Sequence, residues 1–126
     1  MKKRIAVIED NPDSLMLIEA LLEDEFDVAI FEDGHAGLAG MRAARPDVVL
    51  LDISLPGKDG IAILGEIRFD AALQRRTVIA LTAHAMQGDR ERFLAAGFDD
   101  SLSKPIVDEG AQFRMIRSHS ERGCIA

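Results

Sequence analysis

Acidic residues stand at two points where an apolar run of the chain gives way to polar sequence. Glu9 and Asp10 directly follow the run Ile5–Ile8, and Asp52 directly follows the run Val48–Leu51. Three carboxylates gathered at one place repel one another unless a cation neutralises them. Mg²⁺ suits such a group, since it takes octahedral oxygen ligands and is often held by one or two carboxylates plus a phosphate. We therefore expect Asp10 and Asp52 to bind Mg²⁺ directly, and Glu9 to act through water.

A hydroxyl and an ammonium group follow two later apolar runs. Thr82 comes after Val78–Leu81, and Lys104, with Pro105 behind it, comes after a weak run around Leu102. A fixed positive charge and a hydroxyl donor near a bound cation suit the binding of a phosphoryl group. Each of these polar residues, taken alone, is ordinary at a strand end. Their coincidence is what indicates a site.

The elements that must position these residues follow from the hydrophobic pattern. The run Val28–Phe31 brings the number of expected strands to five. The first, third and fourth runs show no polar alternation, which is typical of central parallel strands covered by helices on both faces. Asn11 is suited to cap a helix that has Pro12 in its first turn. That helix has an apolar stripe of Leu15, Ile18, Leu21 and Leu22, and other helical segments lie near Gly34–Ala44, Asp59–Phe69 and Met86–Ala96.

This alternation of strands and helices predicts the fold class. An α/β protein with a doubly wound parallel sheet is expected, and its crossovers should be right-handed. Ligands of such sheets bind at the carboxyl ends of the strands. The acids, the hydroxyl and the ammonium group all stand at that edge, so the function should be sought there.

Composition limits the function further. The 126 residues favour one domain (1–126), and 48% apolar and 29% charged residues are typical of a water-soluble globular protein. No apolar run approaches the roughly 18 residues of a membrane span, and the basic start is not followed by a signal-peptide pattern, so we expect a cytoplasmic protein without a membrane partner. A formal charge of −7 argues against nucleic acid as a partner. Cys124, the single cysteine, is assigned no role.

Other chemistries of doubly wound sheets do not match the residues present. A dinucleotide-binding or phosphate-cradling loop needs glycines after the first strand, where this chain has Glu9–Pro12. The acids there argue against a flavin mononucleotide site as well. A G-x-S-x-G nucleophile elbow is absent, and the segment Asp52-Ile53-Ser54 lacks the second aspartate of D-x-D phosphatases. The remaining interpretation makes Asp52 itself the group that is phosphorylated.

In order and spacing, these residues resemble the receiver domains of two-component response regulators. The resemblance covers about residues 3–106 and is carried by Glu9-Asp10, Asp52–Gly60, Thr82–Met86 and Ser103-Lys104-Pro105. The stretch ALTAHAMQGDRERFLAAGFDDSLSKPI is most similar to single-domain regulators of cell-cycle phosphorelays and to receivers of hybrid histidine kinases. The family has a flavodoxin-like fold, so the resemblance implies the strand order 2-1-3-4-5.

The resemblance also implies a reaction at Asp52. A histidine kinase or a histidine phosphotransfer protein would donate a phosphoryl group to this phosphoacceptor. The metal ligands for Mg²⁺ would be Glu9, Asp10, Asp52 and the backbone carbonyl of Ser54. No independent enzyme activity is expected beyond catalysis of its own phosphorylation and slow autodephosphorylation.

Further roles carry over from the family to single positions. Thr82 and Lys104 would bind oxygens of the phosphoryl group. Ser54 and His84 would border the path of the hydrolytic water and tune its rate, although His84 could equally be an ordinary exposed loop residue. The peptide bond before Pro105 would be cis and aim Lys104, with a proline at a helix start as the alternative.

Two features depart from the family pattern. Receivers usually carry Tyr or Phe three residues before the lysine, at the switch position, where this chain has Ser101. The segment 107–126 is divergent: Gly110 interrupts the helical pattern, and only Phe113 and Ile116 supply an apolar stripe. We expect the last helix to be short or frayed.

The expected protein is a stand-alone receiver that is a monomer or weak dimer. It would signal to an output protein through the face made by the fourth helix, the fifth strand and the fifth helix. One alternative is a phosphorelay shuttle that passes phosphate between histidines. Another is a degenerate receiver used only as a binding scaffold, which the presence of Asp52, Thr82 and Lys104 argues against.

Overall fold

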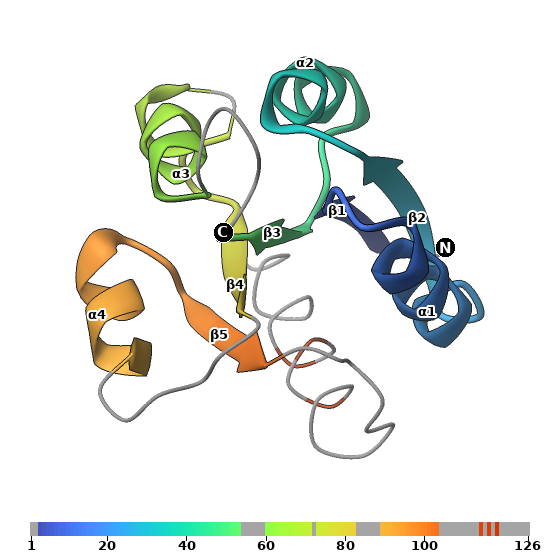
Figure 1. The fold of residues 1–126 in the computed structure, drawn as a ribbon. Helices are drawn as coiled ribbons and strands as arrows, with labels where there is room; N and C mark the ends of the chain where they lie inside the picture. The colour runs from blue at the N-terminus through green and yellow to red at the C-terminus, as the bar shows by residue number, and fades with distance from the viewer. Residues whose placement is uncertain are drawn as a thin grey trace.

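A single parallel sheet organises the chain. The structure is a computed structural model, and it describes residues 3–53, 60–71, 73–82 and 89–103 together with residues 114, 116 and 118. The sheet has five strands in the order β2-β1-β3-β4-β5 (Figure 1). The strands are β1 (Lys3–Ile8), β2 (Phe26–Phe31), β3 (Val48–Asp52), β4 (Thr77–Thr82) and β5 (Asp100–Ser103). All neighbouring strands pair in parallel, which confirms the expected fold class and strand order.

Helices connect the strands and cover both faces of the sheet. Those of the described ranges are α1 (Pro12–Leu22), α2 (Gly34–Ala44), α3 (Gly60–Phe69) and α4 (Asp89–Ala96). Figure 1 shows α1 on one side of the sheet and both α2 and α3 on the other. The expected bounds of α2 are confirmed. The expected first residues of the next two helices, Asp59 and Met86, lie outside the described residues.

The middle strands are apolar on both faces because helices cover both. All five residues of β3 are buried. Since successive side chains of a strand point to opposite faces, β1 contributes to two cores. Ala6 and Ile8 pack in a cluster with residues of α2, α3 and α4, whereas Ile5 and Val7 pack in a cluster with residues of α1. The expected placement of β1, β3 and β4 inside the sheet is confirmed.

Helix α1 begins where the sequence predicts. Asn11 has an extended backbone, and its side chain accepts hydrogen bonds from the N–H groups of Asp13 and Ser14. These bonds satisfy two of the main-chain donors that every helix start leaves without a helical partner. Of the predicted stripe, Leu15, Ile18 and Leu22 are buried and Leu21 is partly buried.

Arg68, near the end of α3, fixes the edge of the sheet at which the strands begin. Its guanidinium donates to the carbonyls of Gln74, Arg76 and Gly97 at 2.6–3.2 Å. It also donates to Oδ2 of Asp99 at 2.9 Å, and the same oxygen accepts a hydrogen bond from the N–H of Val78 at 2.8 Å. One side chain thus joins the end of α3 to the start of β4 and to the turn that leads into β5.

The C-terminal segment is described at three positions. Arg114, Ile116 and Ser118 are helical, and Ile116 is fully buried in the cluster on the α1 side of the sheet. Ile116 of the predicted apolar stripe thus faces the core, whereas Gly110 and Phe113 lie outside the described residues. Among the helices that are described, none is long and apolar enough to cross a membrane.

Candidate functional site

Strand pairing brings the predicted site residues to one edge of the sheet. Ile8 at the end of β1 pairs with Leu51 of β3, and Asp52 pairs with Leu81 of β4. Glu9 follows Ile8, so it stands beside Asp52 across neighbouring strands. The edge is the one predicted from the polar residues that follow each strand.

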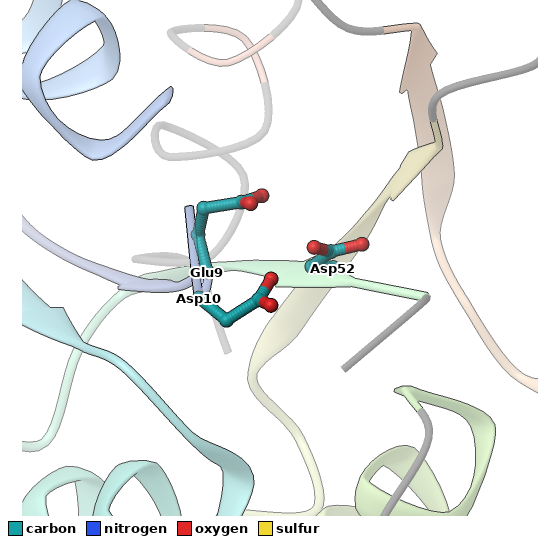
Figure 2. Close-up of side chains that lie close together, drawn as sticks. All are labelled: Glu9, Asp10 and Asp52. Carbon is teal, nitrogen blue, oxygen red and sulfur yellow. The ribbon is translucent and has the colours of Figure 1, made fainter. Parts of the chain in front are cut away.

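Three carboxylates converge there. One oxygen from each of Glu9, Asp10 and Asp52 lies within 4.8 Å of the others. Figure 2 shows Glu9 and Asp10 reaching from the end of β1 and Asp52 from β3, with their carboxylates turned toward a common space. Glu9 is fully buried and Asp52 is 2% exposed, whereas Asp10 is exposed. The cluster is therefore open to solvent on the side of Asp10.

The main chain on each side of these carboxylates is held by hydrogen bonds. The N–H of Glu9 donates to the carbonyl of Phe31 at 3.0 Å, which extends the pairing of β1 with β2 by one residue. The N–H of Asn11 donates to Oε1 of Glu9 at 3.2 Å. The N–H of Ile53 donates to the carbonyl of Leu81 at 3.0 Å, so the chain remains paired just beyond Asp52. The main chain at Glu9 and just beyond Asp52 is thus held by the sheet.

This donor set fits a hard divalent cation. Burying ionised carboxylates is strongly unfavourable unless a positive charge or hydrogen bonds compensate. The oxygens of Glu9, Asp10 and Asp52 are of the type that Mg²⁺ prefers, and three of them within 4.8 Å can share one ion. Asp10, as the exposed member, leaves a side on which water or a phosphoryl oxygen can complete the coordination.

Thr82 and Ser101 lie on one face of neighbouring strands. Thr82 ends β4 and pairs with Ser103, and Ala80 pairs with Ser101. Residues paired across parallel strands point to the same face, and so do residues two apart in a strand. Ala80 belongs to the cluster on the α4 side, so Thr82 and Ser101 face α4 as well. Both are half-buried.

Several predicted site residues lie outside the described residues. They are Ser54, His84, Lys104 and Pro105. Their roles therefore stay predictions from the sequence. The described part of the predicted site is Glu9, Asp10, Asp52, Thr82 and Ser101.

Gly60 is a residue of the site to which the sequence pattern assigned no role. A β-carbon at Gly60 would stand 2.5 Å from the carbonyl oxygen of Asp52 and 2.8 Å from the Cα of Ile53. Only glycine allows α3 to begin this close to the chain beyond β3. A sequence signal for this contact existed: the segment that begins with Asp52 ends with a glycine, Gly60.

Comparison with known proteins decides the family. A family model described as the response regulator receiver domain matches residues 5–115. The chain belongs to this family. As a receiver domain of two-component signalling, it has the fold and the acidic cluster described above.

Relatives of this receiver occur in longer proteins. It is 39% identical over 114 residues to the signal transduction histidine-protein kinase BarA of Escherichia coli K12, and 35% identical over 119 residues to the response regulator PleD of Caulobacter vibrioides NA1000. The matches cover 90% and 94% of this chain. The chain spans 12% of the length of BarA and 26% of the length of PleD.

Solved receiver structures superpose on this one over nearly their whole length. The receiver domain of the sensor histidine kinase PA1611 of Pseudomonas aeruginosa PAO1 gives a TM-score of 0.85 at 35% identity, covering 96% of this chain and 99% of that one. That structure has a magnesium ion coordinated in the active site cleft. The BeF3-activated receiver domain of DrrB gives a TM-score of 0.82 at 27% identity, covering 97% of this chain and 100% of that one.

Proposed function

We propose that this receiver accepts a phosphoryl group on the carboxylate of Asp52. The donor is a phosphohistidine of a histidine kinase or of a histidine phosphotransfer protein. The bond from phosphorus to the histidine nitrogen breaks as a bond to a carboxylate oxygen of Asp52 forms. The observation that carries the proposal is the position of Asp52, which is 2% exposed at the carboxyl end of β3 and faces Glu9 and Asp10.

The acidic cluster holds Mg²⁺ in this proposal. Asp10, Asp52 and the backbone carbonyl of Ser54 would bind the ion directly, and Glu9 would act through water. When bound, the ion would neutralise negative charge on the phosphoryl oxygens, and so reduce their repulsion by the carboxylate of Asp52. Without a cation, three carboxylates would repel an incoming phosphoryl group.

Two further side chains bind the phosphoryl group. Thr82, at the end of β4, donates a hydrogen bond from its hydroxyl, and Lys104 supplies a fixed positive charge. Hydrolysis reverses the modification: a water oxygen attacks phosphorus in line, the bond to Asp52 breaks, and inorganic phosphate leaves while the carboxylate is restored. Ser54 and His84 border the path of that water and set how slowly it attacks.

The phosphorylated receiver signals by protein–protein interaction. Thr82 moves toward the phosphoryl group and pulls the chain after β4 with it. The surface that changes is formed by α4, β5 and the C-terminal helix. Because Ser101 has no ring to move between two positions, little apolar area changes its burial at that surface, and the bias between the two states is small.

A phosphorelay role is the second candidate. The similarity to the histidine-protein kinase BarA favours it, since a receiver in such a chain is suited to pass phosphate onward to another histidine. A receiver that acts as a shuttle returns its phosphoryl group to a second phosphotransfer protein. A receiver that acts only as a binding switch releases it as inorganic phosphate.

Phosphotransfer from labelled donors tests the proposed function. Purified histidine kinases and phosphotransfer proteins, each labelled on histidine, are incubated with the receiver and Mg²⁺, and label on the receiver is followed over time. A cognate donor should label the wild type within seconds to minutes and leave Asp52→Asn unlabelled. Adding an unlabelled phosphotransfer protein then separates the two candidates, because only a shuttle transfers the label onward.

A further inference from the structure

A single residue, Asn11, is hydrogen-bonded both to Glu9 of the acidic cluster and to the start of α1. Its main-chain N–H donates to Oε1 of Glu9 at 3.2 Å. Its side-chain Oδ1 accepts from the N–H groups of Asp13 at 2.9 Å and Ser14 at 3.2 Å. Its carbonyl accepts from the N–H of Leu15 at 3.0 Å. Asn11, which directly follows Asp10, thus makes both the bond to Glu9 and the bonds to the first turn of α1.

Several constraints fix the backbone of Asn11. The ring of Pro12 disfavours a helical conformation for the residue before it, and Asn11 is extended, with φ −84° and ψ 116°. The cap bonds then hold that extended residue against the first turn of α1. Its N–H is therefore kept pointing back toward the carboxylate of Glu9.

Asp10 lies between two fixed points. On the strand side, the N–H of Glu9 is bonded to the carbonyl of Phe31. On the helix side, Asn11 is held by α1. A one-residue connection between fixed ends has little conformational freedom, so gathering the carboxylates around a cation requires little further loss of entropy.

We propose that Asn11 is a positioning residue for the metal site: its cap of α1 holds Glu9 and Asp10 in the arrangement that binds Mg²⁺. This inference rests on the metal site of the proposed function. Residues that orient metal ligands typically change metal affinity by about 10–100-fold when they are mutated. A neutral cap also avoids adding a fourth carboxylate to the three already present.

The chain contains a matched control for the loss of a helix cap. Asp33 caps α2, and its Oδ1 accepts from the N–H of Ala36 at 2.7 Å. Asp33 is exposed and is not a member of the acidic cluster. Removing this cap should destabilise the fold by a comparable amount and leave the metal site intact.

The test measures the affinity for Mg²⁺ alone by NMR titration of the amide signals of residues 8–11, 13 and 14; Pro12 has no amide proton. The salt concentration is about 0.15 M, to screen distant charges. The free energy of unfolding in urea is measured for the same proteins. Asn11→Ala should bind Mg²⁺ about tenfold more weakly than the wild type. Asn11→Ser, which keeps a capping oxygen, should restore binding. Asp33→Ala should lose stability and keep the affinity of the wild type.

Amide hydrogen exchange without metal is a second test of the positioning role of Asn11. In Asn11→Ala the amides of residues 10, 11, 13 and 14 should exchange faster than in the wild type, whereas in Asp33→Ala they should not. If Asn11→Ala is unfolded, Asn11→Gly serves instead, because glycine is tolerated as a cap but leaves the loop freer, and it should weaken Mg²⁺ binding in the same direction.

The outcomes separate this inference from the function on which it rests. The positioning role is overturned if Asn11→Ala, or Asn11→Gly in its place, binds Mg²⁺ as tightly as the wild type does. That result would leave the proposed metal site unaffected. Equal weakening in Asp33→Ala also overturns it, because the effect would then reflect general stability. A wild type that binds no Mg²⁺ overturns both the inference and the metal site.

Discussion

Gly60 lies against the main chain of Asp52. A β-carbon on Gly60 would stand 2.5 Å from the Asp52 carbonyl oxygen, and the N–H of Gly60 donates to the carbonyl of Ile53 at 3.0 Å. The first residue of α3 and the end of β3 are therefore packed backbone to backbone. The three atoms nearest to such a β-carbon all belong to the main chain of Asp52 and Ile53, so either this main chain or the start of α3 would have to shift.

Gly60→Ala should lower both stability and the rate of phosphorylation. We expect a loss of about 1–3 kcal/mol in the free energy of unfolding, as for other overpacked sites, and slower labelling by a small acyl phosphate. Gly65→Ala is the matched control in the same helix, since nothing lies within 4 Å of a β-carbon there. It should stabilise the protein by about 0.5–1 kcal/mol and leave labelling unchanged. Equal behaviour of the two variants would contradict the role of Gly60.

Arg68→Ala should destabilise the protein much more than Arg42→Ala. Arg68 donates to three carbonyls and to the carboxylate of Asp99, and its side chain is 27% exposed. Hydrogen bonds that involve a charged group contribute about 1.5–3 kcal/mol each. Arg42 pairs with Asp70 at 2.6 Å, but its side chain is 56% exposed, and exposed pairs contribute only about 0–1 kcal/mol.

Urea unfolding of the two arginine variants checks this prediction. Arg68→Ala should lose at least about 2 kcal/mol, because several carbonyls lose their partner at once. Arg42→Ala should lie within about 1 kcal/mol of the wild type. Losses of similar size would mean that the Arg68 hydrogen bonds contribute little.

The sequence predicted most of the fold because the fold depends on local patterns. The unbroken apolar runs of β1, β3 and β4 placed these strands inside the sheet, and Asn11 followed by Pro12 marked the start of α1. The polar residues after each strand marked the edge of the sheet at which Glu9 and Asp52 meet.

The features that were not predicted depend on distances between parts of the chain. Arg68 meets Asp99 across 31 positions of sequence, and no local pattern links them. The contact of Gly60 with Asp52 joins the start of α3 to the end of β3, and no local pattern predicts how closely the two approach. The bond from Asn11 to Glu9 joins residues two apart, but it depends on the backbone direction at Asn11, which in our proposal the cap of α1 sets.

Asp10→Asn should weaken Mg²⁺ binding without unfolding the protein. The substitution removes one charge and one carboxylate oxygen from the cluster, and Asp10 is exposed, so its loss leaves no cavity. We expect at least a tenfold loss of affinity, on the order of the effects seen for altered metal sites. Titration of metal-induced NMR shifts measures it, with Asp13→Asn in the first turn of α1 as the control. Unchanged affinity in Asp10→Asn would place the metal elsewhere.

Ser101→Tyr should enlarge the structural response to phosphorylation. Ser101 lies on the same face of the sheet as Thr82, toward α4, so a ring at this position can change its burial when Thr82 moves. More apolar area that differs between two states gives a larger bias between them. NMR spectra with and without beryllofluoride, a mimic of the phosphoryl group, measure the response. A wild type that already shows a complete two-state change across α4 and β5 would refute this account of Ser101.

The central claim is that Asp52 is the phosphoacceptor, and its most direct test is intact-protein mass spectrometry after incubation with a small acyl phosphate and Mg²⁺. The wild type should gain one phosphoryl group, and should gain none when the metal is chelated. Asp52→Asn should gain none under any condition, although its fold and its urea unfolding remain close to those of the wild type. Undiminished labelling of a folded Asp52→Asn protein would contradict the claim.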